Sequence, residues 1–277
     1  MHTAPKVLIV ILNYCAYGMT LEIVDTLHQA LSYPRFDILV VDNASTNESD
    51  KVLRANSEEK GYQYVQSGRN AGYAAGNNIG IRYAVQNGYD YTWVINNDIV
   101  LKDADVLTNL VEAMESRPRV AAVSPRVYDI EGKESFQFFF RPTVWDMSFG
   151  IIGSKKKRAA VDASASREIY RPQGCCMLLR NSAMQEIDYL DEETFLYCEE
   201  PILAERLLEK GYTCFYVAEA RIVHLESSTI GSLHKRFGRA KMILKSENIY
   251  MKKYRRWNAF IRILCCCARG AVVLCRG

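Results

Sequence analysis

The sequence predicts an α/β protein with a Rossmann-like, mostly parallel sheet that is flanked by helices and followed by a helical C-terminal appendage. The first observation is a unit that repeats in the first half of the chain: a short apolar run, a polar loop and a stretch with helical periodicity. The second is that these runs are rich in Val, Ile and Tyr and lack polar alternation. Such runs are typical of parallel strands buried on both faces, so helices are expected on both sides of the sheet.

Five apolar runs in the first half are predicted strands. They are Val7–Leu12, Ile38–Val41, Tyr62–Gln66, Tyr91–Ile95 and Val120–Ser124. The stretches between them have helical spacing, and Ser49 and Asp103 at two of their starts are favoured N-cap residues. The predicted helices are Thr20–Leu31, Ser49–Asn56, Gly72–Gln86 and Asp103–Glu115. A regular order of strands and helices implies right-handed crossovers.

The second half of the chain does not show this regular alternation of strands and helices. Further strands are predicted at Phe136–Phe140, Gly174–Arg180 and Thr213–Ala218, and a further helix at Pro201–Lys210. Gly153–Arg167 carries a run of basic residues followed by small residues. This composition is more typical of a solvated linker than of a binding patch.

Composition and charge narrow the range of functions. The formal net charge of +3 is small, whereas nucleic-acid-binding proteins usually carry a concentrated basic face, so we expect no nucleic-acid partner. The nine cysteines include adjacent groups at Cys175–Cys176 and Cys265–Cys267, which fit neither a disulfide framework nor a zinc site with spaced pairs. Reduced thiols, and a short apolar stretch at Val7–Leu12 without a cleavage pattern, predict a cytoplasmic protein.

Polar residues follow four of the predicted strands. Asn13 and Tyr14 follow the first strand, Asp42 the second, Asn70 the third and Asn96–Asp98 the fourth. In an open parallel sheet, ligands bind beyond the carboxyl ends of the strands. Four polar loops that the topology brings to one edge therefore predict a ligand site at that edge.

Two carboxylates stand at strand ends. Asp42 follows four apolar residues, where it would accept the imide hydrogen of uracil or thymine; the alternative is a helix cap or a loop aspartate. Asp98 would hold Mg2+ or Mn2+ against a diphosphate, whereas a lone aspartate in such a loop is more often a cap. Because Asp98 is the single acid in Asn96–Asp98, phosphates and water would have to complete the coordination.

Three glycines, Gly72, Gly76 and Gly80, recur every four residues and share one face of a predicted helix. Such a stripe permits the close approach of a ligand or of another backbone segment. Gly72 also opens the helix, whose free amides would face a phosphate or a sugar. Tight packing of the helix on the sheet explains the glycines well but leaves Asn77 and Asn78 unexplained.

The remaining candidates lie in the second half of the chain. Glu199 and Glu200 stand directly before Pro201, a favoured first helical residue. A carboxylate held at a helix N-terminus stays ionised and could take the proton of an attacking hydroxyl, or it could simply cap the helix. His224 follows the strand-like Ala220–Val223 and could bind a metal or a phosphate oxygen, although a lone histidine after a strand is more often structural.

Six motifs occur in order between residues 11 and 200, within a matching stretch of roughly residues 7–250 that includes nearly the whole chain. They are Ile11–Tyr14, Val41–Thr46, Asn70–Gly80, Asn96–Asp98, Gly174–Arg180 and Phe195–Glu200. In this order they resemble the motifs of the GT-A glycosyltransferases of family 2, in particular the rhamnosyltransferase-like branch.

The resemblance implies a GT-A fold and a metal-dependent glycosyltransferase with Mn2+ or Mg2+ as its cofactor. The donor would be a nucleotide diphosphate sugar, either a dTDP- or a UDP-sugar, with dTDP-rhamnose as one candidate. The acceptor would be a hydroxyl of a saccharide or of a lipid-linked saccharide. The resemblance also implies an inverting single displacement in cell-envelope or exopolysaccharide synthesis.

The resemblance assigns roles to individual residues. Asp42 would contact the pyrimidine base, Asp98 the metal, and His224 the region of the diphosphate. Glu200 would be the general base, with Glu199 as the neighbouring catalytic candidate. The further donor-binding residues would be Asn13, Tyr14, Asn70, Gly72, Asn77 and Asn97.

The chain also departs from the family pattern. The family usually has Glu-Asp in place of Glu199–Glu200, an asparagine in place of Cys15 and an aspartate in place of Asn47. The altered acid pair and the single acid at Asp98 leave an alternative, a nucleotide-sugar-binding module with weak or no activity. A sugar nucleotidyltransferase is disfavoured, because Asn13–Gly18 is not the Gly-rich, basic loop that would hold a triphosphate.

We expect the chain to divide into two parts. Residues 1–230 would form the GT-A domain, with a nucleotide-binding half at 1–125 and an acceptor-binding half at 126–230. Residues 231–277 would form a helical segment.

Four arginines, Arg255, Arg262, Arg269 and Arg276, recur every seven residues in this segment and would form one stripe on a helix. One interpretation is an amphipathic helix that lies on the anionic inner face of the cell membrane and brings the site to a lipid-linked acceptor. The alternative is a helix that docks on the protein itself, and Gly270 argues against a continuous helix.

Overall fold

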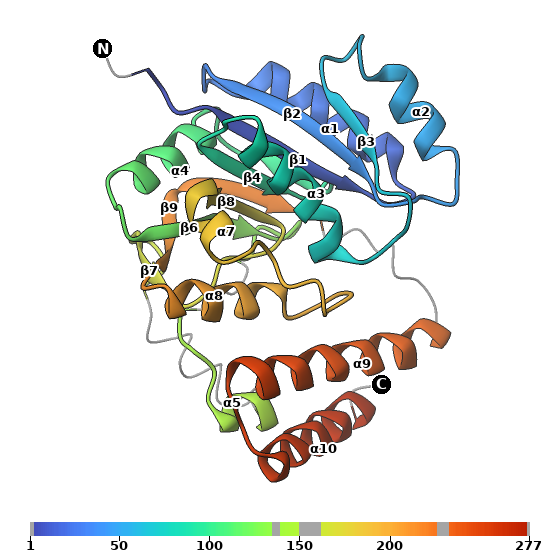
Figure 1. The fold of residues 1–277 in the computed structure, drawn as a ribbon, viewed down its shortest axis with the longest axis vertical. Coiled ribbons are helices and arrows are strands. Elements are labelled where there is room, and N and C mark those ends of the chain that lie inside the picture. The colour runs from blue at the N-terminus through green and yellow to red at the C-terminus, as the bar shows by residue number, and fades with distance from the viewer. Residues whose placement is uncertain (1–2, 135–138, 150–161, 226–232, 276–277) are drawn as a thin grey trace.

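The computed structural model describes residues 3–134, 139–149, 162–225 and 233–275. The nine strands in these ranges form one sheet in the order β3-β2-β1-β4-β8-β6-β9-β5, with β7 paired to β9 (Figure 1). The strands are β1 (Val7–Asn13), β2 (Phe36–Asp42), β3 (Gln63–Gln66), β4 (Tyr91–Ile95), β5 (Ile99–Leu101), β6 (Val120–Tyr128), β7 (Arg167–Ile169), β8 (Cys176–Arg180) and β9 (Thr213–His224). The helices are α1 (Tyr17–Ala30), α2 (Ser49–Asn56), α3 (Tyr73–Gln86), α4 (Val106–Glu115), α5 (Val144–Phe149), α7 (Asn181–Glu186), α8 (Glu199–Glu209), α9 (Leu233–Ile249), the π-helical turn η1 (Tyr250–Tyr254) and α10 (Ala259–Cys275).

The first half of the chain forms the parallel part of the sheet. β3, β2, β1 and β4 run parallel, and the strands and helices predicted for this half are confirmed, with α2 at the predicted bounds. The predicted caps Ser49 and Asp103 were wrong. Glu48 is the N-cap residue of α2 and makes no side-chain cap hydrogen bond, while Oδ1 of the preceding Asn47 accepts a hydrogen bond from the Ser49 amide at 3.1 Å. Asp103 forms an ion pair with Arg221 at 2.7 Å and does not cap α4.

The second half of the chain joins the sheet in a different order. β8 lies between β4 and β6 and is antiparallel to both, whereas β6 and β9 are parallel. Six of the nine described strands run in one direction, so the mostly parallel sheet is confirmed. The predicted alternation of strands and helices through Val120–Ser124 is interrupted once, by the short strand β5 between β4 and α4. In the sheet, β8 lies beside β4. The short elements β5, β7, α5 and α7 were not predicted, since three to six residues carry too little periodicity.

Two predicted strands of the second half are confirmed as β8 and β9, and β9 continues past Ala218 to His224. The predicted strand Phe136–Phe140 and loop Gly153–Arg167 lie mostly outside the described residues.

Successive residues of β1 enter different hydrophobic cores. Val7, Ile9 and Ile11 pack with α1, α2 and α4, whereas Leu8 and Val10 pack with α3. α7 and α8 cover the antiparallel part of the sheet on the α3 side. Both sets of side chains are fully buried, which confirms a sheet covered by helices on both faces.

The glycine stripe of α3 serves close packing of this helix on β1. A Cβ atom at Gly76 would lie 2.6 Å from the Leu12 side chain, and one at Gly80 would lie 2.5 Å from Val10. Glycine therefore allows α3 to approach the sheet more closely than any other residue would.

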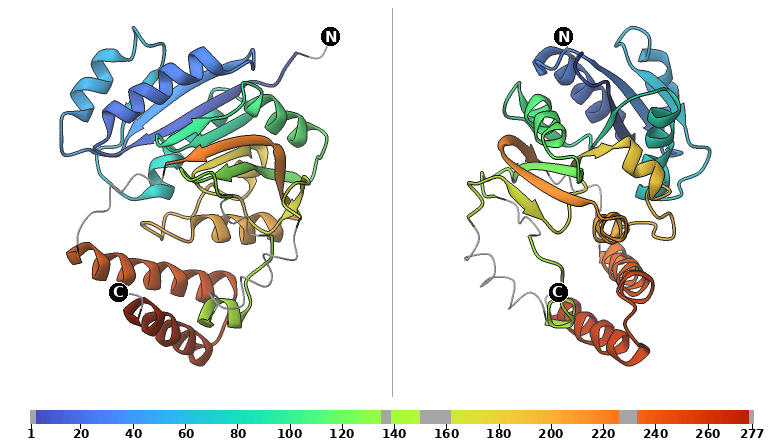
Figure 2. Two further views of the ribbon diagram at one scale, coloured as in Figure 1. Left: turned by 180° about the vertical axis from the view of Figure 1, so that it is seen from behind. Right: turned by 60° about the vertical axis from the view of Figure 1, so that its left-hand side comes forward.

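The C-terminal helices α9 and α10 lie beyond α8, on the side away from the sheet (Figure 2). Tyr250 and Met251 of η1 pack with Ile202 of α8 and Cys265 of α10. The alternative of a helix docked on the protein is thereby confirmed. No helix in the described ranges is both long enough and apolar enough to cross a membrane.

The prediction of a single arginine stripe was wrong. Arg255 precedes α10, and Arg276 lies outside the described residues. Gly270 lies within α10 without ending it. The helix therefore begins after Arg255, later than predicted, and it continues through Gly270 without a break.

The two arginines within α10 face α9. Arg262 donates a hydrogen bond to Asn248 Oδ1 at 2.8 Å, and Arg269 pairs with Glu247 at 3.2 Å. Their guanidinium groups therefore hold the two helices together and do not form an outward-facing row.

Candidate active site

The loops that follow β1, β2 and β4 meet at one edge of the sheet, as predicted. Asn13 at the end of β1 donates to Asp42 Oδ1 at 2.7 Å, across the register that pairs these two residues. The Thr20 hydroxyl donates to Asn13 Oδ1 at 2.8 Å and accepts from Asn97 Nδ2 at 3.0 Å. Thr20 was not predicted as a site residue, because its position in α1 gave no sign of a polar contact with two other loops.

Asp42 and Asn13 are both fully buried. The Asp42 carboxylate accepts hydrogen bonds from the Ser45 hydroxyl at 2.6 Å and the Ser45 amide at 3.0 Å, in addition to that from Asn13. In this arrangement Asp42 orders the loop after β2. Tyr14 is exposed at the rim of the same edge. Contact of Asp42 with a base stays a prediction and would require this buried carboxylate to become accessible.

The loop before α3 is fixed by Asn70 and Gly72. Asn70 Oδ1 accepts hydrogen bonds from the Gly72 amide and from Asn43 Nδ2, both at 3.1 Å. Gly72 has φ +97°, and a Cβ there would lie 2.1 Å from the Phe195 carbonyl oxygen, so glycine is required. The first amide of α3, that of Tyr73, donates to the same carbonyl at 2.9 Å. This amide is therefore not free for a phosphate, and contact of the other amides of the first turn with a phosphate or a sugar stays a prediction.

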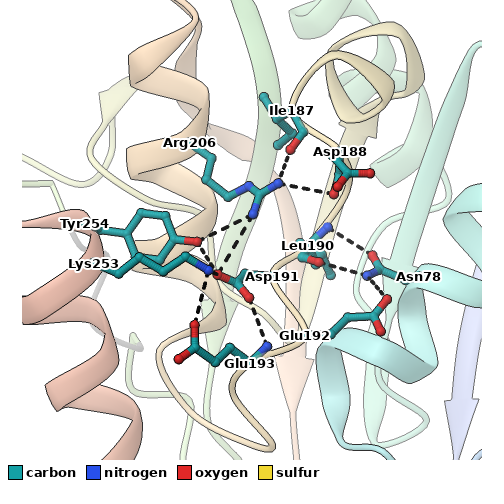
Figure 3. A network of polar contacts seen from close by, with 10 residues as sticks. All are labelled: Asn78, Ile187, Asp188, Leu190, Asp191, Glu192, Glu193, Arg206, Lys253 and Tyr254. Atoms are coloured by element: carbon teal, nitrogen blue, oxygen red, sulfur yellow. Dashed lines mark hydrogen bonds and ion pairs between the residues drawn. The ribbon is translucent and has the colours of Figure 1, made fainter.

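The two asparagines of α3 differ in their contacts. Asn78 donates to the Leu190 carbonyl and to Glu192, both at 2.8 Å, and ties α3 to the segment before α8 (Figure 3). Asn77 donates to the Tyr73 carbonyl at 3.0 Å, while its buried Oδ1 has no hydrogen-bond partner among the described residues. A buried acceptor without a partner is costly, so Asn77 remains the better donor-binding candidate of the two.

Asp98 and His224 form the contact that unites the two halves of the site. Asp98 Oδ1 lies 3.1 Å from His224 Nε2, and the Leu225 amide donates to the Asp98 carbonyl at 2.9 Å. The contact arises because β5, directly after Asp98, pairs with the end of β9, so that Ile99 lies opposite His224. No group of three or more potential metal-binding side chains occurs in the described part of the chain. The carboxylate and imidazole are both metal ligands, and they suit an ion that completes its coordination with phosphate and water.

Glu199 and Glu200 are the first two residues of α8, whereas the sequence predicted a start at Pro201. Tyr197 and Cys198 before them have φ of +73° and +69°. Left-handed backbone at two consecutive residues other than glycine is costly, and it turns the chain sharply into the helix. This turn places one acid in the interior and the other at the surface of the site.

The two acids have different surroundings. Glu200 Oε1 accepts a hydrogen bond from the Gly174 amide at 3.2 Å and pairs with Arg171 at 3.2 Å, and its side chain is 23% exposed. Glu199 is 6% exposed. Burial, together with the charge of Glu200, raises the pKa of Glu199 to about 8. Glu199 therefore holds a proton at neutral pH, and Glu200 is the better proton acceptor.

Cys175 lies between the predicted metal site and the predicted base. Burial raises the pKa of its thiol, and the negative charges of Glu200 and Asp98 raise it further. The Cys175 carbonyl accepts a hydrogen bond from the Asn96 amide at 2.9 Å, which joins the end of β4 to the start of β8. Neither Cys175 nor Arg171 was predicted as part of the site, because nothing in their local sequence indicates the antiparallel insertion of β8.

A second network connects the C-terminal helices with the segment before α8 (Figure 3). Asp191 is buried and accepts hydrogen bonds from Lys253 Nζ at 2.6 Å and from the Tyr254 hydroxyl of η1. Burial opposes the ionisation of Asp191, but these hydrogen bonds outweigh it and lower the pKa. Arg206 of α8 donates to the Ile187 carbonyl in the same network. The segment that leads to the two acids is thus held from both α3 and η1.

Comparison with known sequences gives a family. The profile of Glycosyl transferase family 2 matches residues 7–188. The chain is 28% identical over 210 residues to a low-salt glycan biosynthesis hexosyltransferase of Haloferax volcanii, which covers 68% of this chain and 64% of the relative. It is 26% identical over 223 residues to a poly-beta-1,6-N-acetyl-D-glucosamine synthase of Staphylococcus aureus, which covers 79% of this chain and 50% of the relative. The matches thus span between half and two thirds of these relatives.

Comparison with solved structures supports the architecture. A mannosyltransferase from Pyrobaculum calidifontis, solved in complex with GDP-Man and Mn2+, has a TM-score of 0.63 to this chain at 17% identity. The match covers 99% of this chain and 75% of the mannosyltransferase. Likeness at this identity concerns the fold alone, and it confirms the predicted GT-A fold.

Proposed function

We propose that this chain, which belongs to Glycosyl transferase family 2, is a glycosyltransferase that moves a hexose from a nucleotide diphosphate donor to a hydroxyl acceptor by one inverting displacement. The observation that carries the proposal is the contact between Asp98 and His224, together with the backbone link from the Asp98 loop to Glu200: the Cys175 carbonyl accepts from the Asn96 amide, and the neighbouring Gly174 amide donates to Glu200. A group that binds the leaving diphosphate and a group that accepts a proton would then flank one reacting centre.

The donor would bind along the strand-end loops of residues 1–125. The place of Asp42 at the end of β2 supports a dTDP- or UDP-sugar, with dTDP-rhamnose as one candidate. Tyr14 at the rim, the free oxygen of Asn77 and the loop of Asn70 and Gly72 would supply further contacts. Asn13 and Asn97 would act through Thr20 by keeping these loops together.

Asp98 and His224 would hold a divalent cation, Mn2+ or Mg2+. One carboxylate oxygen and one imidazole nitrogen at 3.1 Å fit an ion that shares its remaining positions with phosphate oxygens and water. When bound, the ion would offset the negative charge that develops on the departing diphosphate. Binding of the ion should therefore depend strongly on the presence of the donor.

Glu200 would act as the general base. As the acceptor oxygen attacks the anomeric carbon, its proton passes to the Glu200 carboxylate, and the bond from the anomeric carbon to the diphosphate oxygen breaks. The sugar is transferred with inversion and the nucleoside diphosphate leaves. Arg171 and the Gly174 amide hold Glu200 Oε1, which orients the carboxylate before the acceptor arrives.

The acceptor would be a saccharide or a lipid-linked saccharide bound by residues 126–230, in cell-envelope or exopolysaccharide synthesis. The relatives support a role in glycan assembly, because one is named for glycan biosynthesis and the other as a polysaccharide synthase. The exposed side chain of Phe195, beside Gly72 and ahead of the two acids, offers an apolar surface against which a sugar ring could rest.

A thermal-shift screen tests the proposal. Wild-type protein is mixed with dTDP-, UDP- and GDP-sugars, each with and without Mn2+, and the best donor is then followed by NMR of the product with an alcohol or saccharide acceptor. We expect one pyrimidine donor to raise the melting temperature when Mn2+ is present, by the mass-action effect of binding, and the product to have inverted configuration. Preference for a GDP-sugar would contradict the role of Asp42, and donor binding without transfer would favour the inactive module.

A further inference from the structure

Helix α10 has one apolar face that packs on the protein and a second that does not. Ile261, Cys265 and Cys266 face the cluster formed with α5, α8 and η1. On the other side, Phe260, Ile263 and Leu264 are 77%, 63% and 45% exposed. Cys267, one turn further, is also exposed. These four positions have the spacing of a single helical face, here called the outer stripe.

The outer stripe belongs to the most basic part of the chain. Residues 233–277 contain twelve of the 35 Lys and Arg but one of the 32 Asp and Glu, which gives this segment a formal charge of +11. The remaining residues carry a formal charge of −8. Among the described residues of the segment, Lys241, Lys245, Lys252 and Arg256 are exposed. The outer stripe and these basic side chains therefore belong to helices that lie together at one end of the molecule, as the ribbon in Figure 2 shows for α9 and α10.

We propose that the outer stripe inserts into the interface of an anionic bilayer, while the exposed basic side chains of α9, of η1 and of Arg256 lie at the level of the lipid headgroups. Interfacial helices bind in this way, with the apolar face buried to about 5–10 Å and each nearby Lys or Arg contributing about 1 kcal/mol on an anionic surface. The inference goes beyond the proposed transfer reaction and does not rest on it.

A second copy of this chain could also cover the exposed apolar face, and the charge of the segment favours a bilayer over such a dimer. Two copies that met through their outer stripes would bring two segments of formal charge +11 together, which opposes association. An anionic bilayer attracts the same charge. It also accepts Phe260, Ile263 and Leu264 without requiring a complementary groove.

The membrane surface would lie close to the proposed catalytic acids. Ile202 of α8, three residues after Glu199, packs against Tyr250 and Met251 of η1, and η1 connects directly to the chain that enters α10. A membrane-bound α10 would therefore hold α8, and with it Glu200, at a fixed height above the bilayer.

Vesicle co-sedimentation of the full chain tests the proposal. Vesicles of phosphatidylcholine alone are compared with vesicles that also contain phosphatidylglycerol. The variant Phe260→Ser/Ile263→Ser removes the apolar character of the outer stripe without changing the charge. Its control is Ile130→Ser, which alters an equally exposed isoleucine far from α10 in the sequence.

We expect the wild type and the Ile130→Ser control to bind the anionic vesicles, and the double variant to bind at least ~10-fold more weakly. Transfer to a water-soluble acceptor should be the same in all three proteins, so that failure here is separate from failure of the proposed function. The proposal is overturned if the wild type ignores anionic vesicles or if the double variant binds as well as the wild type. It is also overturned if the wild type is a dimer in sedimentation analysis that the double substitution dissociates.

Discussion

The two sides of the site are held together by different forces. On the donor side, at the ends of β1, β2 and β4, neutral amides and a hydroxyl surround the buried carboxylate of Asp42. Residues such as Thr20 join loops that neighbouring strands already bring together. On the side of the acids, charged groups from distant parts of the chain meet, as in the pair of Asp191 and Lys253.

This difference shows what fixes the positions of the site residues in each region. On the donor side, the register of the parallel strands places the loops, and the polar contacts then stabilise loops that the sheet has already brought together. The segment before α8 has no strand of its own and depends on α3 and η1 for its position. Substitutions should therefore affect donor binding on one side and turnover or acceptor binding on the other.

The largest expected effect concerns Glu200. Glu200→Gln keeps the shape of the side chain but removes the proton acceptor, so the kcat of transfer should fall by roughly 10²- to 10⁴-fold with little change in donor affinity. Glu199→Gln is the matched control and should lower kcat less, because Glu199 already holds a proton at neutral pH. The opposite ranking of the two variants in a transfer assay would make Glu199 the base.

Glu199 should leave a signature in the pH dependence of stability. Its pKa is about 8 in the folded protein, against an ordinary glutamate value of 4.5, so the folded state binds this proton more tightly than the unfolded chain. This contribution to stability is complete below about pH 4.5 and is lost as the pH rises through about 8. Relative to Glu199→Gln, the wild type should lose stability across this window, by up to about 5 kcal/mol.

Urea denaturation at several pH values measures this difference. Glu209→Gln, at an exposed position near the end of the same helix, is the control and should follow the wild type at every pH. Parallel stability curves for the wild type and Glu199→Gln would show that Glu199 is ionised in the folded protein.

Asp98 joins the two sides, and its removal should affect the donor. Asp98→Ala removes one of the two proposed metal ligands and should weaken Mn2+-dependent donor binding by about 10²-fold while leaving the fold intact. Asp103→Ala removes a more exposed carboxylate from the following loop and should leave donor affinity unchanged. Calorimetric titration of donor with and without Mn2+ is the measurement. Equal donor affinity in Asp98→Ala and the wild type would refute the metal site.

The donor side was largely predictable from the sequence, and the other side was not. Apolar runs that end in Asn13, Asp42 and Asn96–Asp98 locate the strand ends, and parallel topology then brings those ends to one edge. The approach of His224 to Asp98 depends on the pairing of β5 with β9, which brings these two residues together although they are 126 positions apart. A three-residue strand carries no periodic signal, so motif resemblance indicated His224 while local sequence did not.

Burial and long-range contacts are the other features of the site that the sequence could not predict. The sequence placed Glu199 and Glu200 side by side but could not distinguish their environments, which differ because Tyr197 and Cys198 adopt left-handed backbone. It also predicted Arg262 on a stripe of four arginines without giving the partner of that stripe, and the side chain contacts α9. Helical periodicity gives the face that a residue occupies, but the partner of that face comes from tertiary packing.

A small change on the donor side tests whether its hydrogen bonds matter beyond the register of the strands. Thr20→Val keeps the volume but leaves Asn13 and Asn97 without a shared partner, which should lower the free energy of unfolding by about 1–3 kcal/mol and raise the KM for donor more than it changes kcat. Thr26→Val removes a hydroxyl of the same helix that bonds only the exposed backbone at Glu22, and it should change neither quantity. Denaturation and steady-state kinetics measure these quantities for the two variants. If both variants keep the stability and the donor KM of the wild type, the register of the strands alone orders the loops at this edge of the sheet.

The smallest expected effect tests the other side. Asp191→Asn keeps the shape of the side chain but weakens its contacts with the half-exposed Lys253 and with Tyr254, so the free energy of unfolding should fall by only about 1 kcal/mol. Because Asp191 holds the segment that leads to the acids, kcat and the KM for acceptor should change while the KM for donor does not. Glu193→Gln removes a more exposed partner of the same lysine and should leave all three unchanged. Asp191→Asn could instead raise the KM for donor as much as Thr20→Val does. That result would show that a change on either side affects donor binding, and that the difference between the two sides has no functional consequence.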